Sequence, residues 1–130
     1  MNLASLGIQF FILSEFDCNC GKCDDANEMD YSFIRQLDKA RSIAGIPFKI
    51  NSGYRCSNKQ EQLYQDGISS VKKSTHELGK AVDLRCRGSA DRSQILKGLI
   101  RADFTRIGLG KSWIHVDKDL KKVHGVIWLY

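Results

Sequence analysis

The residues of this chain that are best suited to chemistry lie in two short stretches, residues 74–83 (STHELGKAVD) and residues 113–117 (WIHVD). They supply His76, Asp83 and His115, and so contain two of the three histidines of the chain. Two imidazoles and one carboxylate suit a zinc ion whose fourth position is left to water, which is the arrangement of a catalytic site. Structural zinc sites are usually closed by four protein ligands. The set therefore predicts one catalytic Zn²⁺, although metal availability also decides which divalent ion such ligands bind.

The segments around the first stretch can bring its two ligands together. The polar residues 68–77 are typical of a loop that ends near His76, and residues 81–86 (AVDLRC) are typical of a short strand that carries Asp83. Gly79 lies between the two ligands and allows the chain to turn sharply. We therefore expect His76 and Asp83 to converge on one ion.

The second stretch is typical of a strand with one polar and one apolar face. Residues 112–117 are expected to be extended, and His115 and Asp117 alternate with apolar residues. Because successive side chains of a strand point to opposite faces, the two polar groups share one face and the apolar pair faces the core.

The remaining pattern indicates an α+β fold. Apolar residues recur at helical spacing in residues 30–44, and a shorter helix is expected over residues 57–65, with Ser57 as its N-cap. A third helix begins at Ser89. Strands are expected at residues 48–52, 81–86, 105–109, 112–117 and 125–130. We expect a small antiparallel sheet flanked by helices on one face, with residues 1–130 as a single domain.

The composition is that of a globular chain without a membrane-spanning segment. With 130 residues, 42% hydrophobic and 27% charged, the chain is long enough to build one core. Nothing approaches the roughly 18 consecutive apolar residues that indicate a membrane-spanning helix. The apolar run 6–13 lacks the basic flank and the cleavage site of a signal peptide, so we expect an N-terminal strand or docking segment.

The net charge of +5 bears on partners rather than on fold. The basic residues are scattered, and no nucleic-acid motif accompanies the densest groups, which are Lys72-Lys73 and Lys118, Lys121 and Lys122. We therefore expect no nucleic-acid partner. A mildly basic surface suits an anionic polymer such as a bacterial cell wall, and it is equally typical of a solvated face without specific use.

The five cysteines do not form an obvious framework. Cys18, Cys20 and Cys23 are clustered, whereas Cys56 and Cys86 are isolated. An odd count without an export signal favours thiols that are reduced where the chain is made. The cluster could hold a second, structural zinc ion, but the sequence shows no evident fourth ligand, and we favour a glycine-containing turn with inert cysteines.

The motifs also resemble those of a known family. Ser-x-His-x-x-Gly-x-Ala-x-Asp, Trp-x-His-x-Asp and the Ser-Gly-Tyr-Arg of residues 52–55 look like the zinc D-Ala-D-Ala carboxypeptidases of peptidase family M15, above all its small phage and prophage members. Residues 11–16 (FILSEF), which lead into a Cys-x-Cys-Gly turn, are also similar. The resemblance covers about residues 10–117 in order. It implies the fold that this family shares with the hedgehog signalling domain, a small antiparallel sheet flanked by helices.

The resemblance also implies roles for single residues. His76, Asp83 and His115 would be the ligands of a zinc ion that activates water and polarises the scissile carbonyl. Arg55 matches the family arginine that binds substrate and steadies the developing oxyanion, for which a fixed guanidinium is well suited; a surface ion pair is the alternative. Ser74 is expected either to hydrogen-bond within the site or to cap the loop.

The general base is the role that the pattern leaves open. Many members of the family place Asp or Glu three residues before the last ligand histidine, and here that position is Ser112, which cannot serve. Asp117 is the first candidate because it shares a face with His115, and the alternative is that it orients a ligand. Glu77 adjoins a ligand in sequence but need not point the same way, and His124 is expected at the surface.

The function implied by the resemblance is hydrolysis of peptide bonds in the stem peptides of bacterial peptidoglycan, of the D-Ala-D-Ala carboxypeptidase or L-Ala-D-Glu endopeptidase type. We expect a monomeric phage or prophage lysis enzyme, made in the cytoplasm without a signal peptide and released to the cell wall through a holin-type pore. The alternative is a catalytically impaired, zinc-stabilised module that binds cell-wall peptides or a protein partner. Ser112 favours this alternative.

Overall fold

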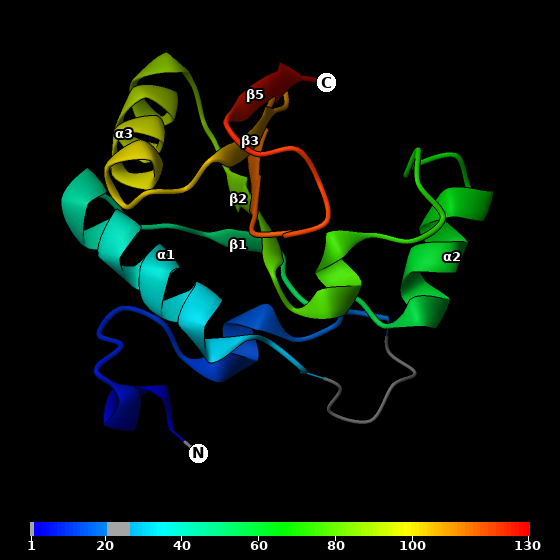
Figure 1. Cartoon of the computed structure of the whole chain (residues 1–130), viewed down its shortest axis with the longest axis horizontal. Coiled ribbons are helices and arrows are strands. Elements are labelled where there is room, and N and C mark those ends of the chain that lie inside the picture. Colours follow the sequence, from blue (N-terminus) through cyan, green and yellow to red (C-terminus); the bar gives the residue numbers. More distant parts are fainter. Residues whose placement is uncertain (1, 21–26) are drawn as a thin grey trace.

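The computed structural model describes residues 2–20 and 27–130 (Figure 1). Its 3₁₀ turns are η1 (Leu3–Leu6), η2 (Leu13–Phe16) and η3 (Thr75–Leu78), and its helices are α1 (Tyr31–Ala44), α2 (Ser57–Gln65) and α3 (Ser89–Arg101). The strands are β1 (Ile50–Ser52), β2 (Ala81–Arg85), β3 (Arg106–Leu109), β4 (Trp113–Asp117) and β5 (Val126–Leu129). None of the helices in these residues is long and apolar enough to cross a membrane. Cys23 lies outside the described residues, so the predicted turn there remains a prediction.

Within the described residues the strands form one sheet in the order β1-β2-β4-β3-β5. The three pairs β1–β2, β2–β4 and β4–β3 are antiparallel, whereas β5 is parallel to β3. The α+β fold is thus confirmed, with one strand in a direction that was not expected. The cause is the short connection after β4, because β4 ends beside the start of β3. Residues 118–125 only need to cross to the far side of β3, where Val126 N–H donates to the Thr105 carbonyl oxygen.

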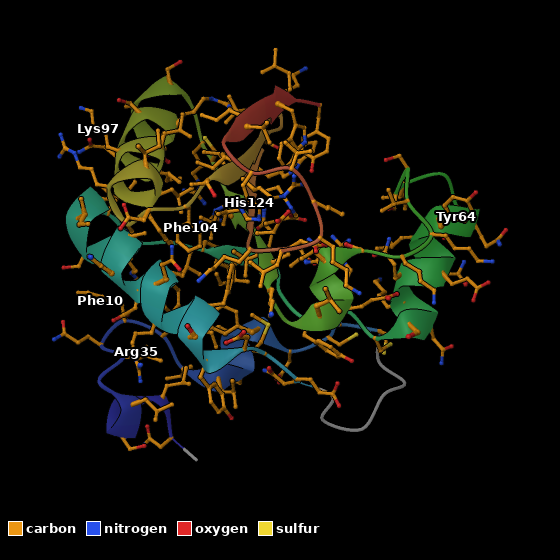
Figure 2. The ribbon with its side chains drawn as sticks, viewed as in Figure 1. Phe10, Arg35, Tyr64, Lys97, Phe104 and His124 are labelled. Carbon is orange, nitrogen blue, oxygen red and sulfur yellow. The ribbon has the colours of Figure 1, made fainter. Side chains whose placement is uncertain are left out.

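Two helices cover one face of the sheet. Figure 1 shows α1 and α3 side by side on one side of the strands, with α2 on the other side. The helices approach closely at Gly98, where an added Cβ would lie 2.3 Å from the Ala40 carbonyl oxygen. Phe104 points into the core (Figure 2), where its ring lies 5.7 Å from that of Phe33. The opposite face of the sheet is therefore left for the site.

The N-terminal apolar run docks on α1 and does not form a strand. The backbone N–H groups of Gln9 and Phe10 donate to the two carboxylate oxygens of Asp38, at 3.0 and 2.8 Å. Because a side chain of α1 takes the donors that a neighbouring strand would use, the predicted strand is wrong and the docking alternative is the one observed.

The start of α2 also differs from the sequence-based expectation. Cys56, and not Ser57, is the N-cap, and its Sγ accepts a hydrogen bond from Lys59 N–H at 3.4 Å. The helix bounds themselves are those predicted. A thiol is an uncommon cap, because hydroxyl and carboxylate oxygens are preferred at this position.

Candidate metal centre

One row of residues across the sheet carries the candidate site. The registers of the strands place Ser52, Asp83, His115, Gly108 and Trp128 next to one another, in the order of the strands β1, β2, β4, β3 and β5. Residues paired in this way share one face of a sheet. The two apolar neighbours of His115 on β4 are 0% exposed and lie in the core on the other face. The predicted alternation along β4 is therefore confirmed.

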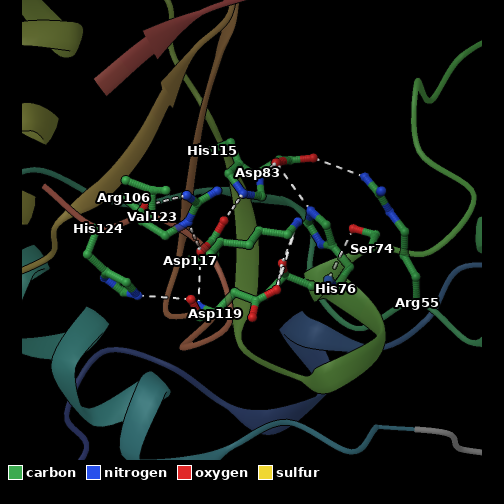
Figure 3. Close-up of polar contacts among 12 residues, drawn as sticks. Arg55, Ser74, His76, Asp83, Arg106, His115, Asp117, Asp119, Val123 and His124 are labelled. Atoms are coloured by element: carbon green, nitrogen blue, oxygen red, sulfur yellow. Dashed lines mark hydrogen bonds and ion pairs between the residues drawn. The ribbon is translucent and has the colours of Figure 1, made fainter. Parts of the chain in front are cut away.

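The three predicted ligands converge on one point (Figure 3). One donor atom each of His76, Asp83 and His115 lies within 4.8 Å of the other two. Asp83 Oδ1 is 2.9 Å from His115 Nδ1 and 3.4 Å from His76 Nε2. Asp83 and His115 lie 32 residues apart in the sequence, and the antiparallel pairing of β2 with β4 brings them together.

The opposite nitrogen of each imidazole has a partner that fixes the ring. His76 Nδ1 lies 2.7 Å from the Gly53 carbonyl oxygen, and His115 Nε2 lies 2.7 Å from Asp117 Oδ2. Both partners accept hydrogen bonds, so each imidazole in its neutral form carries its proton on this outer nitrogen. His76 Nε2 and His115 Nδ1 can then bind a metal beside Asp83, whereas without a metal a proton on His115 Nδ1 bridges to the Asp83 carboxylate. The donor set and its outer hydrogen bonds therefore fit zinc.

The charge states of the three groups support this conclusion. Burial acts to raise the pKa of Asp83, but the hydrogen bond with His115, followed by the interactions with His76, outweighs burial and holds the pKa well below its usual range. Burial lowers the pKa of His76. Burial also acts against a charged His115, but hydrogen bonds to Asp117 and Asp83 outweigh it and raise the pKa of His115. Asp83 is thus an anion and His76 neutral, whereas His115 gives up a proton when a metal binds.

Arg55 is fixed beside the site by three hydrogen bonds. Its Nε donates to Ser52 Oγ, its Nη1 to Gln60 Oε1 and its Nη2 to Asp83 Oδ2, each at 3.0 Å. Gln60 is itself 0% exposed and donates to Ser69 Oγ and to the Val71 carbonyl oxygen. The guanidinium thus pairs with a candidate metal ligand inside the cleft, which differs from the surface ion pair that was the alternative.

Asp117 is engaged on both of its carboxylate oxygens. Oδ2 accepts from His115 Nε2, and Oδ1 accepts from Arg106 Nε at 2.8 Å and from Asp119 N–H at 3.1 Å. Burial acts to raise the pKa of Asp117, but the hydrogen bonds, first that from His115, lower it to about 2. A general base works best with a pKa near the operating pH. The geometry therefore favours the second of the two roles considered for Asp117, the orientation of His115.

Of the other residues considered for the site in the sequence analysis, two line the cleft and two do not. Ser74 lines the cleft, and its Oγ caps η3 by accepting from His76 N–H at 3.2 Å. Ser112 also lines the cleft. Glu77 and His124 are not among the lining residues. His124 is exposed and contacts Thr105 Oγ1 at 2.7 Å, which agrees with its expected place at the surface.

The site opens into a cleft of about 680 Å³ with an aromatic wall that sequence analysis missed. Trp113 comes from β4, and Trp128 and Tyr130 come from the last strand and its end. The ring of Trp128 lies 5.7 Å from that of His115. Gly108 makes this possible, because a Cβ there would lie 2.7 Å from the indole. The alternation in residues 126–130 (VIWLY) was the available signal, since it places Trp128 and Tyr130 on one face.

The comparisons with known proteins agree with the fold. The family model described as Peptidase M15 matches residues 9–117, and the chain therefore belongs to the peptidase M15 family. Among solved structures, the crystal structure of the Serratia marcescens L-Ala D-Glu endopeptidase ChiX is similar in fold, with a TM-score of 0.61 and 20% sequence identity over 72% of this chain and 83% of that chain. No curated protein matches the chain. Strand β5 follows the residues that the family model matches.

Proposed function

We propose that this M15 peptidase is a zinc enzyme that hydrolyses a peptide bond in the stem peptides of bacterial peptidoglycan. The observation that carries the proposal is the convergence of His76, Asp83 and His115 in the lining of one cleft. The fold that the chain shares with an L-Ala D-Glu endopeptidase supports this class of substrate. The bond that we propose is cleaved is of the L-Ala-D-Glu or the D-Ala-D-Ala type.

Each side chain of the cleft has a proposed task. Zinc, when bound by the three ligands, supplies an activated water and a Lewis acid for the scissile carbonyl. Arg55 is held so that its remaining N–H groups can bind a substrate carboxylate or the developing oxyanion. Ser74 caps η3 and offers its hydroxyl to the bound peptide. Asp117 holds the ring of His115 in the orientation that presents Nδ1 to the metal.

Digestion of purified peptidoglycan tests the proposal directly. We expect purified protein to contain zinc, to solubilise cell walls and to release new free amino termini, and mass analysis of the fragments identifies the bond. We further propose that the chain acts as a monomer on the cell wall, after release through a holin-type pore. Intact cell walls after prolonged incubation with the zinc-loaded protein would contradict the proposed activity.

A catalytically impaired binding module is the second candidate. It is favoured by the engagement of the lining carboxylates, which could otherwise act as a general base. Among the described residues that line the cleft, Asp83 and Asp117 are the carboxylates, and both are already hydrogen-bonded within the protein. A module of this kind binds stem peptides without releasing amino termini. The digestion experiment therefore separates the two candidates when it is combined with a peptide-binding titration.

Replacing Asp117 with asparagine distinguishes a positioning residue from a general base. Because a neutral amide holds His115 less firmly, we expect zinc affinity to fall about 10–100-fold, with turnover largely restored at saturating zinc. Competition with a chelator measures the affinity, and activity as a function of zinc concentration measures the rescue. Glu77→Gln is the matched control, because Glu77 adjoins a ligand but does not line the cleft.

The opposite pattern would assign Asp117 to proton transfer. In that case zinc affinity stays unchanged, whereas turnover falls about 10²–10⁴-fold and added zinc does not restore it.

Replacing Tyr130 with phenylalanine tests the contribution of the phenol hydroxyl in the aromatic wall. Burial raises the pKa of Tyr130, and the nearby carboxylates of Asp83 and Asp117 raise it further, so the phenol keeps its proton and can donate to a substrate. One hydrogen bond of about 0.5–1.5 kcal/mol corresponds to a loss of about 2- to 10-fold in kcat/KM. Zinc content should not change. Tyr64→Phe on α2 is the control, because Tyr64 is 42% exposed and does not line the cleft.

A further inference from the structure

A second group of possible metal ligands lies at the start of α2. Cys18 and Cys20 come from the segment after η2, and Cys56 is the N-cap of α2. Their sulfur atoms all lie within 4.8 Å of one another. Cys56 Sγ is 3.7 Å from Cys20 Sγ, although these residues are 36 positions apart in the sequence. The fold thus adds a thiol from a distant segment to the cluster that the sequence shows.

The spacing of the sulfurs fits a tetrahedral metal. Zinc–sulfur bonds of about 2.3 Å place two thiolates about 3.8 Å apart across one edge of a tetrahedron. The 3.7 Å between Cys20 and Cys56 is close to this value. Cysteine sulfur is a preferred zinc ligand, and structural zinc sites are commonly built from pairs of short sequence segments that the fold brings together.

The surrounding backbone favours the thiolate form of two of these cysteines. Cys56 N–H donates to Cys18 Sγ, and Lys59 N–H donates to Cys56 Sγ, both at 3.4 Å. Cys56 also lies at the positive end of the nine-residue helix α2.

We propose that Cys18, Cys20 and Cys56 bind a structural zinc ion that is separate from the ion held by the histidines. The three thiolates supply three of its four positions, and a further donor atom takes the fourth. This zinc closes a link between residues 18–20 and the N-terminus of α2. The residues that precede these two segments also touch, since a Cβ added at Gly53 would lie 2.8 Å from Phe16 Cα.

The link lies directly beside the substrate-binding arginine. Cys56 follows Arg55 directly in the chain. Tyr54 N–H donates to the Phe16 carbonyl oxygen at 2.9 Å, so the same two segments hold the backbone on the other side of Arg55. The thiolate zinc fixes the position of Arg55 from outside the cleft. This consequence rests on the proposed function, whereas zinc binding by the three thiols does not.

Metal analysis of protein purified without oxygen and with a reductant tests the proposal. We expect about two zinc ions per chain in the parent, about one in Cys56→Ser and about one in His76→Ala. Serine can still cap α2, so the Cys56→Ser chain should keep its helical circular dichroism. Cys86→Ala is the matched control, with zinc content unchanged, because Cys86 lies away from the cluster and contacts the Gly88 carbonyl oxygen.

Cobalt substitution identifies the ligands independently of activity. Sulfur-to-cobalt charge-transfer absorption should persist in His76→Ala and disappear in a Cys18→Ser/Cys20→Ser double variant. The proposal is overturned if Cys56→Ser binds as much zinc as the parent, or if the cobalt spectrum shows no sulfur ligand. Failure of the peptidase activity alone leaves both readouts intact, so the two proposals can fail separately.

Discussion

His115→Ala is expected to abolish peptide hydrolysis and to remove the zinc ion of the cleft. His115 Nδ1 and Asp83 Oδ1, 2.9 Å apart, face one another at the candidate metal position, and no other imidazole among the described residues can replace the lost ligand. Metal catalysis contributes several kcal/mol of transition-state stabilisation, so kcat/KM should fall by at least about 10³-fold. Release of amino termini from cell walls and metal analysis of the purified variant measure the two effects.

The control for this variant is His124→Ala. His124 is exposed and its contacts are Thr105 Oγ1 and the Asp119 carbonyl oxygen, so its loss should leave zinc content and activity near those of the parent. Full activity in His115→Ala would exclude the proposed mechanism. An equal loss in both variants would instead indicate that the effect of His115→Ala does not come from the loss of a metal ligand.

Arg55→Ala is expected to lower turnover by about 10²–10³-fold, the usual result of removing one donor from an oxyanion site. It should also weaken zinc binding, because Arg55 Nη2 donates to Asp83 Oδ2 and so holds a metal ligand in place. Arg55→Lys should not restore activity, since an ammonium cannot reach Ser52, Gln60 and Asp83 from one fixed plane. Kinetics at saturating zinc separate the catalytic effect from the effect on the metal.

Arg85→Ala provides the comparison for Arg55. Arg85 is an exposed arginine on β2, two residues after Asp83, and it is not among the residues that line the cleft. The Arg85→Ala variant should retain the activity of the parent. If Arg55→Ala binds substrate and turns it over like the parent, the guanidinium serves only to hold Asp83, and the proposed role of Arg55 in substrate binding is wrong.

The candidate ligands could be predicted because local sequence determines how they are presented. The glycine turn and the alternation of polar and apolar residues place His76, Asp83 and His115 on loop and strand positions without knowledge of the rest of the chain. Helix bounds were predictable for the same reason, since residue propensity and end signals act within one turn. Family M15 was recognisable from these short motifs.

Features that depend on contacts between distant segments were not predictable in this way. The direction of β5 follows from how β4 ends beside β3, and periodicity within residues 126–130 carries no information about it. The aromatic wall depends on the space above Gly108, and the part played by Asp117 depends on Arg106. Cys56 stands alone in the sequence and joins Cys18 and Cys20 only through the docking of α2.

The row from Ser52 to Trp128 makes metal binding a measure of correct strand pairing. The ligands Asp83 and His115 come from β2 and β4, and a slip of one residue between these strands turns every side chain to the opposite face. Ile114 or Val116 would then occupy the place of His115 on the cleft face, and no donor set would form. A chain that binds zinc in the cleft has therefore already aligned the centre of its sheet. The rate of zinc uptake during refolding can thus report when the register between β2 and β4 is reached.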